Sequence, residues 1–248
     1  MKIVMMSGGI PASAPTAAMG WREWWNPMDI STLYQGAQTT PVTADGQSVY
    51  DMNGNLGVVA TSYFRQATAG SRPLYKTGGA GGKSYLSFDG TDDYMESREA
   101  SNYLAVGAKT ILVAMALQSG TVSPDGVIGD TSSAYQYVRV AASNVLQYTS
   151  YDTGYKYSTG VNYVDNTPFI YAVKHDTGKL YDAKDGVTWT AGVTAGNTGS
   201  LTFLQALGRM GTAYPVVRIY SAAMANVVIS DANLTLCVNY FKQQLGIA

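Results

Sequence analysis

The sequence predicts an all-β protein: a two-sheet antiparallel β-sandwich of the jelly-roll type, with an extended N-terminal arm and one C-terminal α-helix. Three observations predict this class. First, most segments alternate apolar and polar residues with period two. Second, these segments begin and end at Gly, Asp, Asn or Pro. Third, Tyr, Thr and Val, which favour strands, are abundant. The 248 residues fit one large all-β domain, and no linker or composition shift divides residues 21–248.

The expected strands follow one another with the short spacing of a sandwich. In chain order they span residues 84–88, 94–96, 110–118, 126–129, 135–141, 145–149, 155–158, 169–174, 179–182, 188–190, 200–206 and 215–225. Turn sequences such as Asp89-Gly90 and Asp176-Thr177-Gly178 separate them. We expect the first of these turns to close a hairpin, with residues 86–88 leading in and Tyr94 leading out.

A helix is expected at residues 230–245. Ser230 is a good N-cap, Asp231 suits the positive end of the helix dipole, and Gly246 can end the helix. An apolar stripe with helical spacing is formed by Leu234, Cys237, Val238, Phe241 and Leu245. We expect this helix to cover an edge or end of the sandwich, and the thiol of Cys237 to be buried and inert.

Residues 1–20 are predicted to form an extended arm. The apolar patch at residues 3–6 is shorter than the roughly 7–15 apolar residues of a secretory signal, and glycines interrupt it. Small residues and prolines follow. We expect a neighbouring subunit to hold this arm through Ile3, Val4, Met5, Ile10 and Pro11.

The composition restricts the classes of partner. Charged residues make up only 13% of the chain and the net charge is −1, so nothing attracts nucleic acid or an anionic membrane. A surface with few charges suits extracellular or virion proteins and large protein contacts. The single cysteine excludes an intrachain disulfide, and no apolar run reaches the roughly 18–20 residues of a membrane span.

No catalytic residues are predicted. The chain has only three Glu, and no strand carries the alternating acids that would line a glycosidase cleft. Asp92 and Asp93 are sequence neighbours, so in a strand they would point to opposite faces. The only histidine, His175, directly precedes Asp176-Thr177-Gly178 and is expected to be a solvated turn residue. No Gly-x-Ser-x-Gly elbow offers it a nucleophile, which argues against a hydrolase triad. One His and one Cys do not make a zinc site.

Calcium is the one cofactor that the sequence does not exclude. Asp51, Asn53 and Asn55 have the spacing of positions 1, 3 and 5 of a calcium loop, but Leu56 stands where such a loop needs glycine and no acid stands at position 12. The turn acids Asp89, Asp92 and Asp93 could also supply oxygens. Capping of backbone N–H groups explains both sets more simply, so no cofactor is predicted and calcium is the alternative.

Aromatic residues are the most suggestive surface feature, since the chain has 19 Tyr. Exposed tyrosines can stack on sugar rings or anchor a protein interface. The candidates for glycan or partner contact are Tyr148, Tyr151, Tyr155 and Tyr157. The alternative is that tyrosines at alternate positions lie inside the sandwich. Three tryptophans, Trp21, Trp24 and Trp25, crowd one segment and are expected to pack together.

Three stretches together resemble a known family. WNPMDISTLYQGAQTTPVTADGQSVYDMNGN (25–55) is similar to the opening of laminin-G-like, concanavalin-A-like jelly rolls of bacteriophage virion proteins. SRPLY (71–75) with LSFDGTDDYM (86–95) resembles their Arg-Pro and Phe-Asp-Gly-x-Asp-Asp-Tyr signature, and VRIYSAAMANVVISDANLTLCVNYFKQQLGI (217–247) resembles their closing strand, turn and terminal helix. Val227 and Asn233 replace an Arg and a Glu of that turn, which suggests apolar packing around Val227.

The resemblance implies a two-sheet jelly roll whose members bind glycans, bind proteins or build particles; fold alone does not choose among these. Our leading hypothesis is a non-enzymatic structural protein of a phage virion, most simply a capsid decoration protein. It would contact other virion proteins in many copies or as a homo-oligomer. The alternative is a tail-associated adhesin that binds host-surface glycans through the Tyr-rich loops. A glycanase would need two carboxyl groups facing each other about 5–10 Å apart in a groove.

Overall fold

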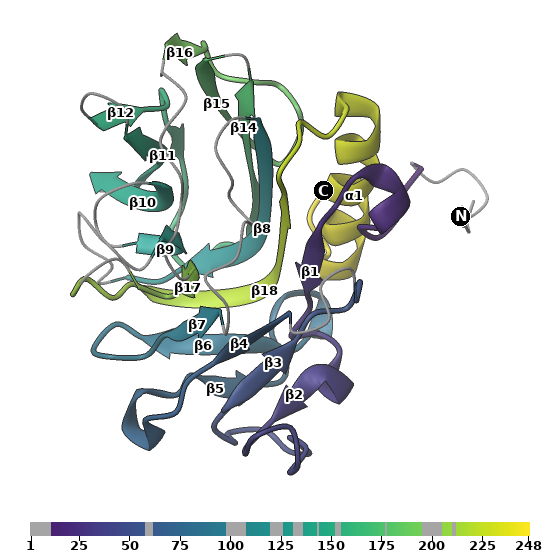
Figure 1. Cartoon of the computed structure of the whole chain (residues 1–248), viewed down its shortest axis with the longest axis vertical. Coiled ribbons are helices and arrows are strands. Elements are labelled where there is room, and N and C mark those ends of the chain that lie inside the picture. The colour runs from purple at the N-terminus through teal and green to yellow at the C-terminus, as the bar shows by residue number, and fades with distance from the viewer. Residues whose placement is uncertain are drawn as a thin grey trace.

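A computed structural model describes residues 11–57, 62–97, 108–119, 126–130, 136–142, 144–151, 155–176, 178–194, 205–209 and 212–248. The chain forms two antiparallel β-sheets packed face to face, and one α-helix lies against the outer face of one sheet (Figure 1). The predicted all-β sandwich with a C-terminal helix is therefore confirmed. In the described part of the chain, four short 3-10 helices lie in the connections: η1 (Ala17–Met19), η2 (Ile30–Thr32), η3 (Ala69–Ser71) and η4 (Ala80–Gly82).

The first sheet, called sheet A here, has the order β16-β15-β14-β8-β18-β6-β5, and β1 also pairs with β18. Its strands are β1 (Glu23–Trp25), β5 (Leu74–Lys76), β6 (Tyr85–Asp89), β8 (Lys109–Leu117), β14 (Phe169–Asp176), β15 (Lys179–Lys184), β16 (Val193–Thr194) and β18 (Val216–Ala225).

The second sheet, sheet B, has the order β12-β11-β10-β9-β17-β7-β4-β3-β2, and β13 also pairs with β11. Its strands are β2 (Leu33–Tyr34), β3 (Asp51–Asn53), β4 (Tyr63–Arg65), β7 (Met95–Ser97), β9 (Gly126–Asp130), β10 (Gln136–Ala142), β11 (Val145–Tyr151), β12 (Tyr155–Tyr157), β13 (Val161–Asn162) and β17 (Gln205–Leu207).

Most predicted strands occur with ends shifted by a residue or two. The strand expected at 188–190 is wrong, because the chain is extended there without sheet pairing and the next strand is β16. The strand expected at 200–206 overlaps β17, and its residues 200–204 lie outside the described residues. The strands that sequence reasoning missed, β1–β5, β13 and β16, have only two or three residues each, which is too short to show an alternation.

Two apolar layers hold the protein together. The core between the sheets receives Ile111, Val113, Met115 and Leu117 from β8, and the layer between sheet A and the helix receives Leu112, Ala114 and Ala116 from the same strand. Every residue of β8 is buried because both faces of this strand are covered. On the helix side sheet A presents many alanines, which let the helix approach the strands closely.

The helix α1 (Asp231–Leu245) forms as its sequence predicts. The Ser230 side chain accepts a hydrogen bond from the backbone N–H of Asn233, and Gly246 ends the helix with φ 66°. The whole predicted stripe is buried. The helix covers a face of sheet A rather than an edge or end of the sandwich (Figure 1). Burial raises the pKa of the Cys237 thiol to about 12, in agreement with the expected buried residue.

The N-terminal segment from residue 11 lies along α1 of its own chain. Asn239 Nδ2 donates to the carbonyl oxygen of Pro11 at 3.0 Å, and the Ser13 N–H donates to the carbonyl oxygen of Leu236 at 3.0 Å. Met19 is buried in the helix layer. Residues 11–19 are therefore held by their own chain, and contact of Pro11 with a neighbouring subunit stays a prediction. The candidates Ile3, Val4, Met5 and Ile10 lie outside the described residues.

The tryptophan segment is divided between the two layers. Trp25 faces the core between the sheets, where its ring lies 4.7 Å from that of Phe64. Trp21 and Trp24 face the helix layer, because side chains in the strand β1 alternate between faces. The expectation that the three rings pack together is therefore wrong.

Two further expectations differ from the observed exposure of the side chains concerned. His175 belongs to β14 and is only 1% exposed, so it is not a solvated turn residue. Burial and the nearby charge of Lys109 lower the pKa of His175 to about 4. Val227 is 43% exposed, and its methyl group nevertheless lies close enough to Gly20 to contact a Cβ placed there. Apolar packing around Val227 is thus only partial.

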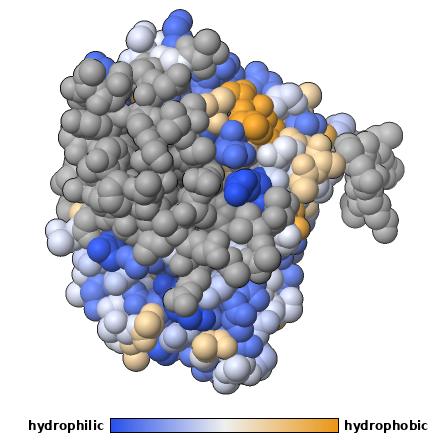
Figure 2. Space-filling model, viewed as in Figure 1, coloured by the Kyte–Doolittle hydropathy of each residue, from blue (hydrophilic) through white to orange (hydrophobic). Residues whose placement is uncertain are grey.

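The surface in Figure 2 is mostly hydrophilic in the lower half of the view, over β2, β3 and β5, and carries a hydrophobic patch in the upper half. In the part of the chain that the structure describes, no helix has the length and apolar character needed to cross a membrane.

Candidate functional site

The acidic turn, residues 89–93, connects the two sheets. It follows β6 of sheet A and leads to β7 of sheet B, so the expected hairpin is wrong. Gly90 has φ 80° and lies against Val216, where a Cβ would come within 2.4 Å of the valine side chain. The turn is therefore specified by the left-handed backbone and the close approach that only glycine allows.

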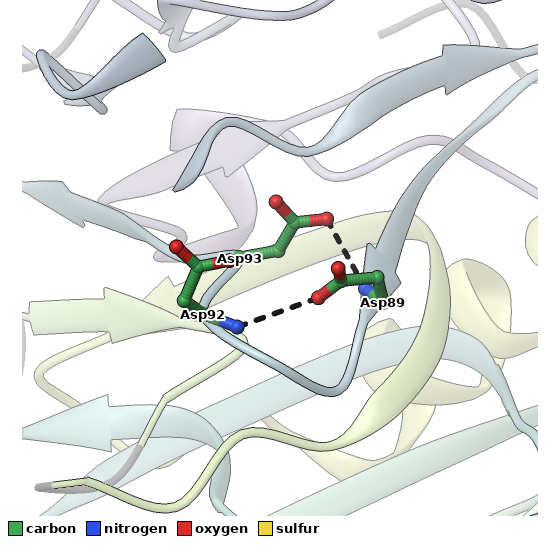
Figure 3. A group of neighbouring side chains, drawn as sticks. All are labelled: Asp89, Asp92 and Asp93. Atoms are coloured by element: carbon green, nitrogen blue, oxygen red, sulfur yellow. Dashed lines mark hydrogen bonds between the residues drawn. The ribbon is translucent and has the colours of Figure 1, made fainter. Parts of the chain in front are cut away.

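The three carboxylates of this turn come together, as Figure 3 shows, with one ligand atom from each lying within 4.8 Å of the others. The prediction that Asp92 and Asp93 point apart is wrong, because they lie in a loop rather than in a strand. Asp89 Oδ1 accepts from the N–H groups of Thr91 and Asp92, and Asp93 Oδ2 accepts from the Asp89 N–H. The expected capping of the loop backbone is therefore present.

Asp93 is only 6% exposed, whereas Asp89 and Asp92 face solvent. Burial, followed by the charges of Asp89 and Asp92, raises the pKa of Asp93 to about 7. A pKa above the ordinary value of 3.8 means that the folded state favours the protonated acid. The free energy of unfolding should therefore fall as the pH rises from about 4 to about 7.

We expect Asp93→Asn to remove this dependence. The amide oxygen can still accept from the Asp89 N–H, while no charge develops at high pH. The variant should be more stable than the wild type at pH 8 by about 1–3 kcal/mol and no more stable at pH 3.5. Urea unfolding at both pH values measures this, and an unchanged difference between the two proteins across pH would contradict it.

Calcium binding at this turn would change the relative stability of the wild type and Asp93→Asn at pH 8 in the opposite direction. Each of the three carboxylates has one oxygen that the hydrogen bonds above and the bond from Ser71 Oγ to Asp92 Oδ2 leave unused, so a cation fits the donor type of the cluster. A bound cation would stabilise the wild type at pH 8 and not Asp93→Asn. Calcium here stays a hypothesis.

The other calcium candidates do not fit an ion site. Asp51 is fully buried and binds Arg65 through both carboxylate oxygens, at 2.7 and 2.8 Å. Asn53 Oδ1 accepts from Gln38. Asn55 belongs to a turn held by Glu23, whose carboxylate accepts from the N–H of Leu56 at 2.8 Å. The contacts of these side chains hold the strand β3 and its neighbours in place and do not form a calcium loop.

The predicted tyrosine contacts are only partly available. Tyr148 is fully buried in the core between the sheets, so its expected role as a surface contact is wrong. Tyr157 is half-buried, and the guanidinium carbon of Arg139 lies 4.2 Å from the centre of its ring. The side chains of Tyr151 and Tyr155 lie outside the described residues; their backbones pair across β11 and β12.

A better candidate site is a pocket of about 260 Å³ on sheet B, called the β4–β7 pocket here. It is lined by Arg65, Gln66, Ala67, Thr68, Tyr94, Glu96 and Ser97. Arg65 ends β4 and Glu96 lies in the neighbouring strand β7, where the register places the two residues opposite each other. This volume is slightly below the roughly 300–1,000 Å³ of sites for drug-sized ligands, so the pocket suits a smaller molecule.

Two charged residues that line the pocket, Arg65 and Glu96, belong to a row of four across three adjacent strands and a loop. Asp51 of β3 lies opposite Arg65, and Arg65 lies opposite Glu96. Arg209, which follows β17, donates from Nη1 to Glu96 Oε1 at 2.8 Å. The order is therefore acid, base, acid, base, and the charges of this row sum to zero. The side chains of Arg65 and Glu96 are 21% and 29% exposed.

Aromatic rings form cation–π contacts with the arginines of the row. The guanidinium of Arg65 lies 4.9 Å from the ring centres of both Tyr50 and Tyr63. That of Arg209 lies 4.4 Å from the ring centre of Tyr94. Such cation–π contacts favour one side-chain arrangement, so the pocket walls are largely pre-organised.

Hydrogen bonds connect the pocket with the acidic turn. Gln66 Nε2 donates to the carbonyl oxygen of Tyr94, and the Tyr94 N–H donates to the carbonyl oxygen of Ser71, both at 3.2 Å. Ser71 Oγ donates to Asp92 Oδ2 at 2.8 Å. The acidic turn is therefore a neighbour of the pocket rather than a separate feature. The sequence reasoning missed the pocket, because its residues meet through strand register and carry no local motif.

Comparison with known proteins supports the fold alone. No protein-family model matches the chain, and no curated protein matches it. Among solved structures, a Trypanosoma rangeli sialidase in complex with sialic acid is 11% identical, with a TM-score of 0.61 over 99% of this chain. The botulinum neurotoxin serotype D/C binding domain is 9% identical, with a TM-score of 0.52 over 86% of this chain. The chain covers 36% and 52% of those proteins, respectively.

Proposed function

We propose that this protein is a non-catalytic module that binds carbohydrate in the β4–β7 pocket. The observation that carries the proposal is the row of paired planar side chains, Arg65 and Glu96 above all, beside the ring of Tyr94. Guanidinium and carboxylate groups hydrogen-bond hydroxyl groups in fixed geometry, and an aromatic ring gives a sugar an apolar face to lie on. The β-sandwich is also the fold of a toxin binding domain, which is compatible with a binding role.

The pairing of the carboxylates favours binding over hydrolysis. A glycosidase keeps one carboxyl group protonated as its acid, which requires surroundings that disfavour the charge. In the β4–β7 pocket Glu96 is ion-paired with Arg209, and the neighbouring Asp51 is ion-paired with Arg65. Both carboxylates therefore already act as hydrogen-bond acceptors for cations of the protein, a role that suits binding better than acid catalysis.

The proposal is tested by titrating the protein with a panel of mono- and oligosaccharides, with and without calcium. We expect weak binding by the wild type and at least a tenfold loss for Tyr94→Ala and for Glu96→Ala. The matched controls are Tyr157→Ala and Asp165→Ala, which remove the same side-chain types away from the pocket. No binding to any sugar of the panel, or equal losses for the control variants, would contradict the proposal.

A second candidate, which is compatible with the first, is a structural role in a phage virion, with capsid decoration ahead of tail attachment. The observation that favours it is the resemblance of residues 25–55, 71–95 and 217–247 to phage jelly rolls, together with the low charge of the chain. Residues 2–10, which precede the contacts of Pro11 and Ser13 with α1, are the part of the arm that we propose contacts another virion protein.

Deleting residues 2–10 should then abolish incorporation into particles without unfolding the domain. Particles assembled with the deleted and the full-length protein can be compared by imaging and protein analysis, with circular dichroism as the control for folding. Normal incorporation of the deleted protein would contradict the arm hypothesis, and absence of the full-length protein from all particles would contradict the virion role.

A further inference from the structure

We infer that the β4–β7 pocket selects neutral sugars over acidic ones, and that adjacent hydroxyl groups of the sugar bridge Arg65 and Glu96. This inference rests on the proposed carbohydrate binding and specifies its ligand class. It follows from how the charges around the pocket are already paired, from the chemistry of hydroxyl groups, and from the acidic turn beside the pocket.

The arginines Arg65 and Arg209 near the pocket already form ion pairs with carboxylates of the protein. Arg65 donates from Nε and Nη2 to the two oxygens of Asp51, which is fully buried. Separating such a pair would leave a buried carboxylate without a partner, which is strongly unfavourable. Arg209 binds Glu96, which is partly exposed, through one hydrogen bond from Nη1 to Oε1 at 2.8 Å. A carboxylate on the ligand would therefore have to compete with protein carboxylates for both cations.

Arg72 adds a positive charge near the pocket, but the protein already uses two of its donor groups. Its Nε donates to the carbonyl oxygen of Gln66 at 3.0 Å, and its Nη2 donates to that of Ala67 at 2.8 Å. Gln66 and Ala67 form part of the pocket wall, so Arg72 supports the wall with these donors rather than offering them to the ligand.

Hydroxyl groups suit the alternating row because each can donate and accept. A guanidinium has five N–H donors, so Arg65 keeps donors beyond the two bonds to Asp51. The Glu96 carboxylate keeps lone pairs beyond the bond from Arg209. The two side chains start from opposite positions on strands that lie about 4.8 Å apart. One hydroxyl can accept from Arg65 while its neighbour on the sugar ring donates to Glu96.

The electrostatic surroundings also disfavour a negative ligand. Glu96 forms part of the pocket wall, and the turn that holds Asp89, Asp92 and Asp93 adjoins Tyr94 on the other side. Asp89 and Asp92 are exposed and their charges act through solvent, so their repulsion of an acidic sugar is weak and depends on salt. The repulsion by Glu96 is the main effect, since it acts at contact distance.

The test compares sugars that differ only in charge. Methyl glucoside, methyl galactoside and methyl mannoside are titrated against the corresponding uronates, which carry a carboxylate at carbon 6, at pH 7 and low salt. We expect each neutral sugar that binds to bind at least tenfold more tightly than its uronate. In Glu96→Gln this preference should shrink severalfold, because the amide keeps the hydrogen-bonding shape without the charge. Asp165→Asn, which removes one surface charge elsewhere, should leave the preference unchanged.

The outcomes separate the two proposals. Uronates that bind as tightly as the neutral sugars would overturn the inference and leave carbohydrate binding intact. A preference for neutral sugars that Glu96→Gln does not change would also overturn it, since the selection would then arise elsewhere. Binding by none of the six sugars, nor by the larger panel, would overturn the proposed function and the inference with it. Thermal unfolding of each variant shows that the comparison is made on folded protein.

Discussion

Replacing Asp182 by alanine should lower the free energy of unfolding by about 3–5 kcal/mol, the largest effect we expect from any polar substitution in this protein. Asp182 lies in β15 and is fully buried between the sheets. Its carboxylate accepts from Ser158 Oγ at 2.5 Å, from the Gly160 N–H at 3.0 Å and from the Tyr171 hydroxyl at 3.1 Å, and it also binds Thr190 Oγ1.

The cost is large because several buried donors lose their acceptor at once. Tyr171 belongs to sheet A, whereas Ser158 follows β12 of sheet B, so this carboxylate joins the two sheets. Each stranded buried donor costs about 1–3 kcal/mol. Asp182→Asn should lose less, because the amide oxygen keeps part of the bonding. Asp165→Ala is the control and should change stability by less than about 0.5 kcal/mol. Urea unfolding gives these values, and a loss below 1 kcal/mol for Asp182→Ala would contradict the assignment.

The second large effect is expected for Gly208→Ala. Gly208 has φ +74°, and a Cβ built there would lie 2.3 Å from Cδ1 of the fully buried Phe88 ring. The backbone conformation costs about 1 kcal/mol with a side chain, and forcing the ring aside in a packed core costs about 1–3 kcal/mol more. We therefore expect a total loss of about 2–4 kcal/mol in the free energy of unfolding.

Gly78→Ala is the matched control for this prediction. Gly78 has nearly the same backbone angle, φ +70°, but a Cβ there meets nothing within 4 Å. Its loss should therefore be only the backbone cost of about 1 kcal/mol. The difference between the two variants measures the contact with Phe88. Equal losses would show that the ring is free to move and that the core is looser at this point than the structure indicates.

The parts of the fold that could be predicted from the sequence are those specified by local pattern. The helix α1 was predictable because Ser230, its apolar stripe and Gly246 mark its start, face and end. Long strands such as β8 and β14 were predictable from their apolar runs. Burial was harder to predict, since alternation shows that half of a strand faces inward without showing which half. Tyr148 was placed on the surface for that reason, and His175 because the predicted strand ended at residue 174, before a turn; both are buried.

The site could be predicted only in part. The acids of residues 89–93 are adjacent in sequence, so their cluster was visible, although the passage of this loop from one sheet to the other was not. The β4–β7 pocket depends on Arg65, Glu96 and Arg209, which lie far apart in the chain and meet through the pairing of β4, β7 and β17. Strand register over such separations leaves no periodic signal in the sequence.

The most direct test of carbohydrate binding at this place is to map a bound sugar onto the chain. Backbone amide resonances of the labelled protein can be followed by NMR while the tightest-binding neutral sugar is added. We expect the shifted resonances to cluster at Arg65, Thr68, Tyr94 and Glu96 and their strand neighbours in β4 and β7. Shifts centred on β11 and β12, around Tyr151 and Tyr155, or no shifts at saturating sugar, would contradict it.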